Sequence, residues 1–172
     1  NLTEEKQLLA MDEEKQPTGG LHFVGKKDEL IKAKRCVRPV EDRDVLIIHA
    51  RGRFFALDSH CYHAGGELLN GDIEEINGRL CMVCPRHKYK ICVADGEGLY
   101  TATDTNENPP VKKWYSYGVK QRTHLVKEIN GDVFVKLSRY PGWLESDFYQ
   151  GERGKVERVK AAEAAKKKSS KS

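Results

Sequence analysis

The sequence lacks any long apolar run. None of its hydrophobic stretches approaches the roughly 20 residues that a helix needs to cross a bilayer, so this chain of 172 residues is expected to have no membrane span. Residues 1–20 are polar and acidic, and they lack the charged and apolar pattern of a secretory signal. We therefore expect a soluble, cytoplasmic protein in which residues 1–20 form a flexible leader.

The sequence also lacks the even set of cysteines that a disulfide framework requires. Its five cysteines are Cys36, Cys61, Cys81, Cys84 and Cys92. An odd number, without a signal pattern, indicates a reducing compartment in which some cysteines serve as ligands. Cys36, Cys81 and Cys92 fall in expected strands, where we interpret them as small hydrophobic residues.

Excess charge of one sign is missing from the body of the chain. The net charge is +4, but residues 151–172 hold eight Lys or Arg and three Glu, so the remaining residues carry −1. A nucleic-acid-binding domain needs a basic face on its folded part, so nucleic acid is not an expected partner. The basic residues 151–172 favour helix locally, but they offer little apolar surface to hold one in place, and we expect a flexible tail.

Alternating apolar runs predict a β-hairpin on each side of the central region. The first hairpin is expected to use residues 35–40, 45–50 and 53–57, after a short helix at 26–34. The second hairpin has runs at 119–128 and 132–138 on either side of Asn130-Gly131, which is the strongest short hairpin signal. Between the hairpins, residues 58–116 are rich in Gly and Pro. This composition predicts tight loops rather than long regular elements, with short strands at 80–83 and 89–94.

Two short motifs in this central region carry the chemistry. Cys61-Tyr62-His63 and Cys84-Pro85-Arg86-His87 each place a thiolate and an imidazole within one loop. Zinc accepts two thiolates and two imidazoles in a tetrahedron, and a [2Fe–2S] cluster can take the same four ligands. Zinc motifs usually pair like ligands, whereas each loop here supplies one Cys and one His. The mixed pairing suits a binuclear cluster held between two loops, although a structural zinc site stays open.

The two motifs, extended to Cys61–Gly66 and Cys84–Tyr89, resemble the two cluster-binding boxes of Rieske proteins. The resemblance covers about residues 22–138, and within that family the chain is most similar to Rieske-type ferredoxins. It implies an all-β fold: a Rieske-type antiparallel β-sandwich over residues 21–150. A small two-loop cluster-binding subdomain, about residues 58–116, would be inserted between the hairpins.

The resemblance also implies a role for each ligand of one [2Fe–2S] cluster per chain. Cys61 and Cys84 would hold the buried iron through their thiolates. His63 and His87 would hold the outer iron and turn their other ring edges toward solvent. Gly65-Gly66 would allow a sharp turn that places backbone N–H groups near the bridging sulfurs.

Two departures from the respiratory Rieske proteins refine this expectation. Those proteins brace the loops with a disulfide, but the corresponding positions here are Gly66 and Arg86. They also place a hydroxyl two residues after the second His, where this chain has Tyr89. Fewer donors to the sulfurs stabilise the added electron less, so we place the reduction potential toward the low end of about −150 to +300 mV.

These features predict a monomeric electron carrier without its own catalytic residues. It would pass one electron between redox protein partners, from a reductase to an acceptor such as an oxygenase. Alternatives are a redox-sensing or cluster-delivery module and a structural zinc domain. An oxygenase subunit would need a further two-His, one-carboxylate iron site, but His124 is the only His after His87.

The four histidines outside the two motifs are interpreted as structural residues. His60 is interpreted as a loop residue satisfied by backbone, and His22, His49 and His124 as ordinary strand residues. The sharper hypothesis concerns three acidic side chains between the two motifs, Asp72, Glu74 and Glu75. They would form a docking patch for a basic partner, because charge speeds the encounter of transient redox partners.

Overall fold

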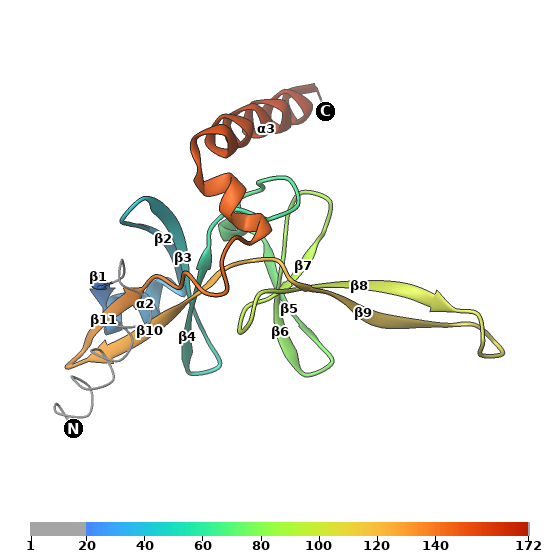
Figure 1. The fold of residues 1–172 in the computed structure, drawn as a ribbon, viewed down its shortest axis with the longest axis horizontal. Coiled ribbons are helices and arrows are strands. Elements are labelled where there is room, and N and C mark those ends of the chain that lie inside the picture. Colours follow the sequence, from blue (N-terminus) through green and yellow to red (C-terminus); the bar gives the residue numbers. More distant parts are fainter. Residues whose placement is uncertain (1–19, 172) are drawn as a thin grey trace.

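The chain folds into two antiparallel β-sheets, which lie side by side in Figure 1. The computed structural model describes residues 20–171. The first sheet has the order β1-β11-β10-β4-β3-β2. Its strands are β1 (Leu21–Lys26), β2 (Arg35–Val40), β3 (Arg43–Ala50), β4 (Arg53–Asp58), β10 (Thr123–Ile129) and β11 (Asp132–Lys136). The leader predicted at residues 1–20 lies almost wholly outside the described residues.

The second sheet is inserted in the chain between β4 and β10. Its order is β5-β6-β7-β8-β9. Its strands are β5 (Asp72–Ile76), β6 (Arg79–Val83), β7 (Lys90–Cys92), β8 (Glu97–Asp104) and β9 (Val111–Val119). The helical elements are α2 (Lys27–Ala33), η1 (Leu68–Asn70), η2 (Glu145–Gln150) and α3 (Glu152–Lys171). The predicted all-β, antiparallel architecture is confirmed, and so are the short helix and the turn at Asn130-Gly131.

Two predictions about the regular elements are wrong. The strand expected to begin at residue 119 begins at Thr123, because Gln121 and Arg122 turn inward and are fully buried, while Val119 ends β9. The central region also contains long regular elements. Strands β8 and β9 form a hairpin of eight and nine residues that projects from one end of the molecule (Figure 1). Several of the turn-forming residues gather at its tip, including Pro109-Pro110.

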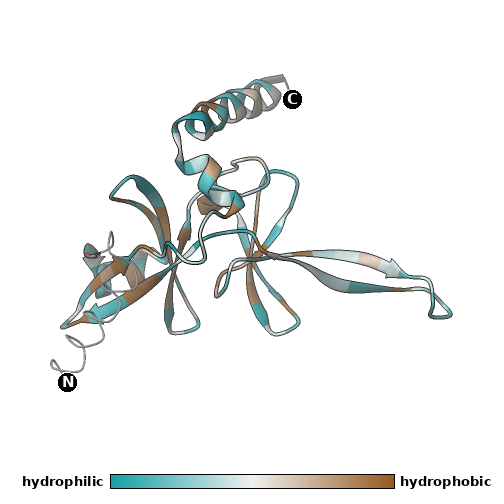
Figure 2. Cartoon of the chain, in the orientation of Figure 1, coloured by the Kyte–Doolittle hydropathy of each residue, from teal (hydrophilic) through white to brown (hydrophobic). Residues whose placement is uncertain are grey.

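A shared apolar core joins the two sheets. Leu46, Ile48 and Leu57 from the first sheet pack with Met82 and Ile91 from the second. The same cluster contains Cys61 and Cys84. Apolar residues accordingly concentrate on the strands in Figure 2, whereas α3 is largely hydrophilic. The burial of these side chains fixes where the two sheets meet, and therefore where the loops at their common edge lie.

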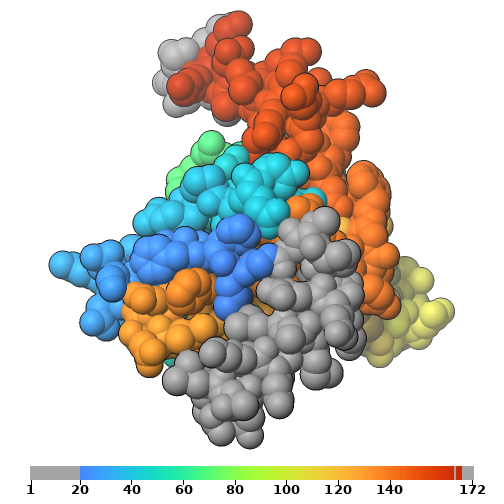
Figure 3. Space-filling model, turned by 60° about the vertical axis from the view of Figure 1, so that its left-hand side comes forward, coloured from blue at the N-terminus to red at the C-terminus, as the bar shows by residue number. Residues whose placement is uncertain are grey.

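The C-terminal residues form helix α3, which projects beyond the strands in the space-filling view (Figure 3). The local preference for helix is thus realised over Glu152–Lys171. Few apolar residues support the helix, and Val156 and Val159 are more than half exposed. Arg158 links it to the body through Asp44 at 3.3 Å. The predicted mobility of this tail stays a prediction. No helix among residues 20–171 is long and apolar enough to cross a bilayer.

Candidate metal centre

Two loops carry the four predicted ligands. The first loop, residues 59–67, follows β4 and closes on itself: the Cys61 N–H donates to the Gly66 carbonyl at 2.8 Å, and the Gly65 N–H donates to the Cys61 carbonyl at 2.8 Å. The second loop, residues 84–89, joins β6 to β7. Its ends stay paired, since the Cys84 N–H donates to the Tyr89 carbonyl at 2.8 Å. Each loop is therefore a tight turn with a fixed base.

The two sulfurs lie together in the core. Cys61 and Cys84 are 0% and 1% exposed, and the Cys61 thiol donates a hydrogen bond to the Cys84 sulfur. This bond, together with burial, raises the pKa of Cys61. The same bond, helped by the Arg86 N–H, lowers the pKa of Cys84 to about 7 although burial opposes the shift. The backbone N–H groups of His63 and Ala64 point at the Cys61 sulfur. Both loops thus supply donors that favour a thiolate.

The two imidazoles lie together at the surface. The rings of His63 and His87 are 5.3 Å apart between centroids and nearly perpendicular, and both side chains are exposed. His63 also stacks on Tyr89, with a centroid distance of 3.8 Å and an angle of 15°. Partial burial, followed by the nearby His87 and Arg86, lowers the pKa of His63. The neutral ring that a metal ligand requires is therefore favoured.

Gly66 lies where the first loop passes close to the second. A Cβ atom at this position would lie 2.8 Å from the Cys84 sulfur and 3.1 Å from Cγ of Arg86. Such contacts are shorter than van der Waals distance, so any side chain here would push the loops apart. The role expected of Gly65-Gly66, backbone N–H groups beside the bridging sulfurs of a cluster, stays a prediction.

Gln121 stabilises the first loop through hydrogen bonds to its backbone. Its side chain is fully buried, and its amide nitrogen donates to the carbonyls of Asp58 and His60 at 2.8 and 2.7 Å. Its amide oxygen accepts the Tyr62 N–H at 2.9 Å. One side chain therefore satisfies three backbone groups on either side of Cys61. Sequence reasoning missed this residue, because the contacts span about sixty positions of chain.

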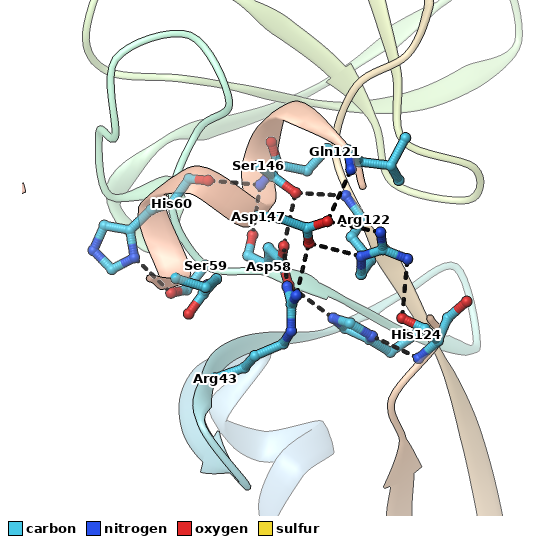
Figure 4. A network of polar contacts seen from close by, with 12 residues as sticks. Arg43, Asp58, Ser59, His60, Gln121, Arg122, His124, Ser146 and Asp147 are labelled. Atoms are coloured by element: carbon cyan, nitrogen blue, oxygen red, sulfur yellow. Dashed lines mark hydrogen bonds and ion pairs between the residues drawn. The ribbon is translucent and has the colours of Figure 1, made fainter. Parts of the chain in front are cut away.

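A buried charge network continues this support beneath the loop (Figure 4). The carboxylate of Asp58, 0% exposed, accepts hydrogen bonds from Arg43 at 2.9 Å, His124 at 2.8 Å and the Ser146 hydroxyl at 2.7 Å. Asp147 pairs with Arg43 at 2.7 Å and with Arg122 at 2.8 Å. The network joins β3, β4 and the start of β10 to η2. It therefore fixes the end of β4, where the first loop begins.

His124 lies in this network rather than at the metal centre. Its Nε2 contacts Asp58, and its Nδ1 accepts the Ser138 N–H at 3.1 Å. Both ring nitrogens are thus engaged. The interpretation of His124 as an ordinary strand residue understated its part in holding the fold.

The C-terminal segment covers the outer side of the first loop. The Tyr149 hydroxyl donates to the His63 carbonyl at 3.3 Å. Arg158 donates to Nδ1 of His60 at 2.6 Å. Burial, followed by the Arg158 cation, lowers the pKa of His60 to about 4. His60 is therefore held by side chains, including Arg158 and Ser59, as well as through its backbone.

The four predicted ligands are arranged as two pairs, one of sulfurs and one of imidazoles. Among residues 20–171, no three or more His, Cys, Asp or Glu side chains form a group that would suit a single metal ion.

The acidic residues of the proposed docking patch are spread along β5. Asp72 is opposite Val83, beside the second loop, whereas Glu75 is opposite Leu80 at the other end and pairs with Arg51 at 2.6 Å.

Comparison with known proteins places the chain in a family. The family model for soluble Rieske-type ferredoxins matches residues 22–140. A human Rieske domain-containing protein is 45% identical over 140 residues, which cover 81% of this chain and 88% of that protein. The chain belongs to the soluble Rieske-type ferredoxins.

Two further ferredoxins are similar to this chain. The ferredoxin component of an alkene monooxygenase system from Xanthobacter autotrophicus is 28% identical over 85 residues, covering 49% of this chain and 67% of that protein. The solved ferredoxin of carbazole 1,9a-dioxygenase from Nocardioides aromaticivorans aligns with a TM-score of 0.51 at 17% identity. That alignment covers 67% of this chain and 95% of the ferredoxin, and it shows a common fold.

Proposed function

We propose that this protein is a one-electron carrier that holds a [2Fe–2S] cluster through Cys61, His63, Cys84 and His87. The single observation that carries the proposal is the division of these residues into a buried sulfur pair and an exposed imidazole pair. In a Rieske centre, two thiolates bind one iron and two imidazoles bind the other. A tetrahedral zinc site instead needs all four donors around one point.

The surroundings of the sulfurs fit such a cluster. N–H groups from the backbone of each loop point at a ligand sulfur, and Gly66 leaves room beside Cys84. Hydrogen bonds to sulfur are among the features that set the potential of an iron–sulfur centre. When bound, the cluster would accept one electron and release it again. The protein would bury the sulfur side and leave the His63 and His87 edges open to a partner.

We place the reduction potential toward the low end of the Rieske range. Tyr89 supports this placement, since it stands where respiratory relatives carry the hydroxyl that donates to a cluster sulfur, and its ring stacks on His63. Gly66 and Arg86 stand where respiratory relatives would carry a bracing disulfide, so the loops depend on hydrogen bonds such as those of Gln121.

The relatives suggest the kind of partner. Two of them are ferredoxins of a monooxygenase and a dioxygenase. We therefore propose that this chain passes electrons from a reductase to an oxygenase-type acceptor, with the exposed imidazole pair at the contact. Asp72, on β5 beside the second loop, is the acidic residue of the predicted patch best placed to attract a basic partner.

The proposal is tested by spectroscopy of the purified protein. We expect visible absorption, two irons and two sulfides per chain, and an EPR signal of low average g after reduction with dithionite. His87→Ala is expected to lose this signal. His49→Ala is the matched control, because His49 packs against Phe54 in the first sheet, and this variant is expected to keep the signal. A colourless protein that contains one zinc ion per chain would contradict the proposal.

A further inference from the structure

A second pair of cysteines lies on the strands that carry the second loop. Cys81 on β6 is directly opposite Cys92 on β7. Both side chains are buried, at 0% and 2% exposure, and they pack with Ile76, Leu99 and Trp114. Cys61 and Cys84 belong to a different apolar cluster. The second pair therefore lies apart from the metal centre.

The register places the two sulfurs close together. The Cys84 N–H donates to Tyr89 and the Val93 N–H donates to Leu80, so the pairs 84/89 and 80/93 are hydrogen-bonded positions of the ladder. Because hydrogen-bonded and open positions alternate, Cys81 and Cys92 occupy an open position. There the Cα atoms approach to about 4.5 Å and the side chains come closest. Disulfides form at Cα distances of about 4.4–6.8 Å.

The surroundings activate Cys92. The single proton of the Cys81 thiol is shared between the Cys92 sulfur and the Arg79 carbonyl, which lies 3.7 Å away, and the backbone N–H groups of Ala94 and Asp95 also donate to the Cys92 sulfur. The guanidinium of Arg79, which pairs with Asp95 and Glu97 at 2.7 Å each, also lies beside this sulfur. The bond from Cys81, the largest of these effects, lowers the pKa of Cys92 to about 6, whereas it raises that of Cys81. Cys92 is therefore the nucleophile of the pair and Cys81 the second thiol.

We propose that Cys81 and Cys92 form a reversible dithiol–disulfide couple that exchanges with small disulfides such as oxidised glutathione. The Cys92 thiolate would attack the small disulfide, break its S–S bond and release one half as a thiol. Cys81 would then lose its proton, attack the Cys92 sulfur and release the second half as a thiol. The protein pair loses two electrons, and the small disulfide gains two electrons and two protons.

Burial of Cys81 and Cys92 limits the rate of this exchange, but it does not decide whether the dithiol or the disulfide is favoured at equilibrium. A cleft of about 160 Å³ lies beside it and is lined by Leu99, Trp114 and Arg79 among others. Leu99 and Trp114 also pack in the apolar cluster that contains the two cysteines. Strand β7 has only three residues. A small opening of this strand toward the cleft would admit the oxidant, so we expect slow exchange.

The bond would act on the second loop. It would close the segment 81–92, which contains both Cys84 and His87, at the base of the loop. Oxidation would thus restrain two proposed ligands without using either of them. The inference does not depend on the proposed cluster, because the chemistry requires only the second cysteine pair.

The test equilibrates the full-length protein anaerobically in glutathione buffers of increasing oxidised fraction. After acid quench and alkylation, trypsin releases residues 80–86 and 91–112. Fragmentation between Cys81 and Cys84 then assigns the partner of Cys92. We expect a Cys81–Cys92 bond whose ratio to the dithiol changes about tenfold for each ~30 mV of buffer potential.

Matched variants complete the test. Cys81→Ala is expected to abolish the linkage, whereas Cys36→Ala, at the half-buried cysteine on β2, is expected to leave the ratio unchanged. The proposal is overturned if both thiols are alkylated at every buffer ratio. It is also overturned if Cys92 bonds only to Cys84, or stops as a mixed disulfide with glutathione in the unmodified sequence. The disulfide linkage found in the unmodified protein decides between these outcomes even if a variant fails to fold.

Discussion

The ring of Tyr149 lies in the space that a side chain at Gly65 would occupy. A Cβ atom at position 65 would be 2.6 Å from Cδ1 of Tyr149, and Gly65 has a φ of +73°. Only glycine combines this backbone conformation with room for the ring. The first loop and η2 therefore depend on each other, although more than eighty residues of sequence separate them.

Gly65→Ala is expected to destabilise the protein and reduce its cluster content. The left-handed backbone and the contact with Tyr149 together are expected to cost about 1–3 kcal/mol. Gly52→Ala is the matched control, because Gly52 has a φ of +71° with no atom within 4 Å of the added Cβ. Urea unfolding and visible absorption measure both variants. Equal losses in the two would show that the Tyr149 contact contributes nothing.

Gln121→Ala is expected to loosen the first loop. Three backbone groups lose their partner, at about 1–3 kcal/mol for a single buried unsatisfied group, so a loss of about 3 kcal/mol in the free energy of unfolding is expected. Gln121→Glu keeps the acceptor for the Tyr62 N–H but loses the two donated bonds and places a buried carboxylate beside two carbonyl oxygens, so at pH 7 it should be at least as destabilising as Gln121→Ala. Urea unfolding checks this order, and an alanine variant as stable as the unmodified protein would contradict it.

Asp147→Asn is expected to destabilise the protein at neutral pH by about 3–5 kcal/mol, because Arg43 and Arg122 lose a buried partner. Asp42→Asn is the control. Its side chain is 76% exposed, with one contact to Arg139 at 3.5 Å, and it should change stability by less than about 0.5 kcal/mol. Unfolding in urea at pH 7 measures both.

The same carboxylate predicts a pH dependence. Burial would raise the pKa of Asp147, but hydrogen bonds from Arg122 and the Leu144 N–H, with the Arg43 and Arg122 cations, lower it to about 2. Because the folded value is below the ordinary one, this stabilisation is present above about pH 4 and is lost as the pH falls toward 2. The unmodified protein should lose about 2 kcal/mol over this window that Asp147→Asn does not lose. Parallel curves for the two proteins would refute this account.

Tyr89→Ala is expected to speed cluster loss, whereas Tyr89→Phe should not. The stacked ring, 3.8 Å from His63, holds the imidazole in one orientation, and an aromatic pair is worth about 1 kcal/mol. The alanine variant should therefore bleach several-fold faster when a chelator is added. Bleaching of the phenylalanine variant at the alanine rate would assign the effect to the hydroxyl instead.

Charge reversal along β5 should depend on position. Asp72→Lys, beside the second loop, is expected to slow reduction by a reductase with a basic docking face more than Glu75→Lys does, because Glu75 lies at the far end of the strand and already pairs with Arg51. Stopped-flow reduction at several salt concentrations measures both, since the difference should shrink as salt screens the charges. Identical rates for both variants at low salt would remove the docking patch.

Local signals predicted much of the fold and the candidate ligands. Asn130-Gly131 predicted a hairpin because a two-residue turn depends on its own residues, and the Cys61 and Cys84 motifs lie in single loops. The length of β8 and β9 was not predictable from turn density, since Gly65, Gly66, Gly71, Gly78 and Gly96 lie before β8 and Pro109-Pro110 lies at the hairpin tip, which leaves both strands long. The contacts of Gln121 and Tyr149 could not be predicted either, because they depend on packing between segments that are distant in the sequence.

Residues beyond the region that matches the family complete the Asp58 network. The family match stops at residue 140, yet Ser146, Asp147 and Tyr149 complete contacts under and around the first loop. A protein truncated after residue 140 would leave Arg43 and Arg122 without the buried carboxylate of Asp147, with which both of them pair. The smallest autonomous piece that preserves the ligand geometry therefore extends through η2, ten residues beyond the border drawn by sequence similarity.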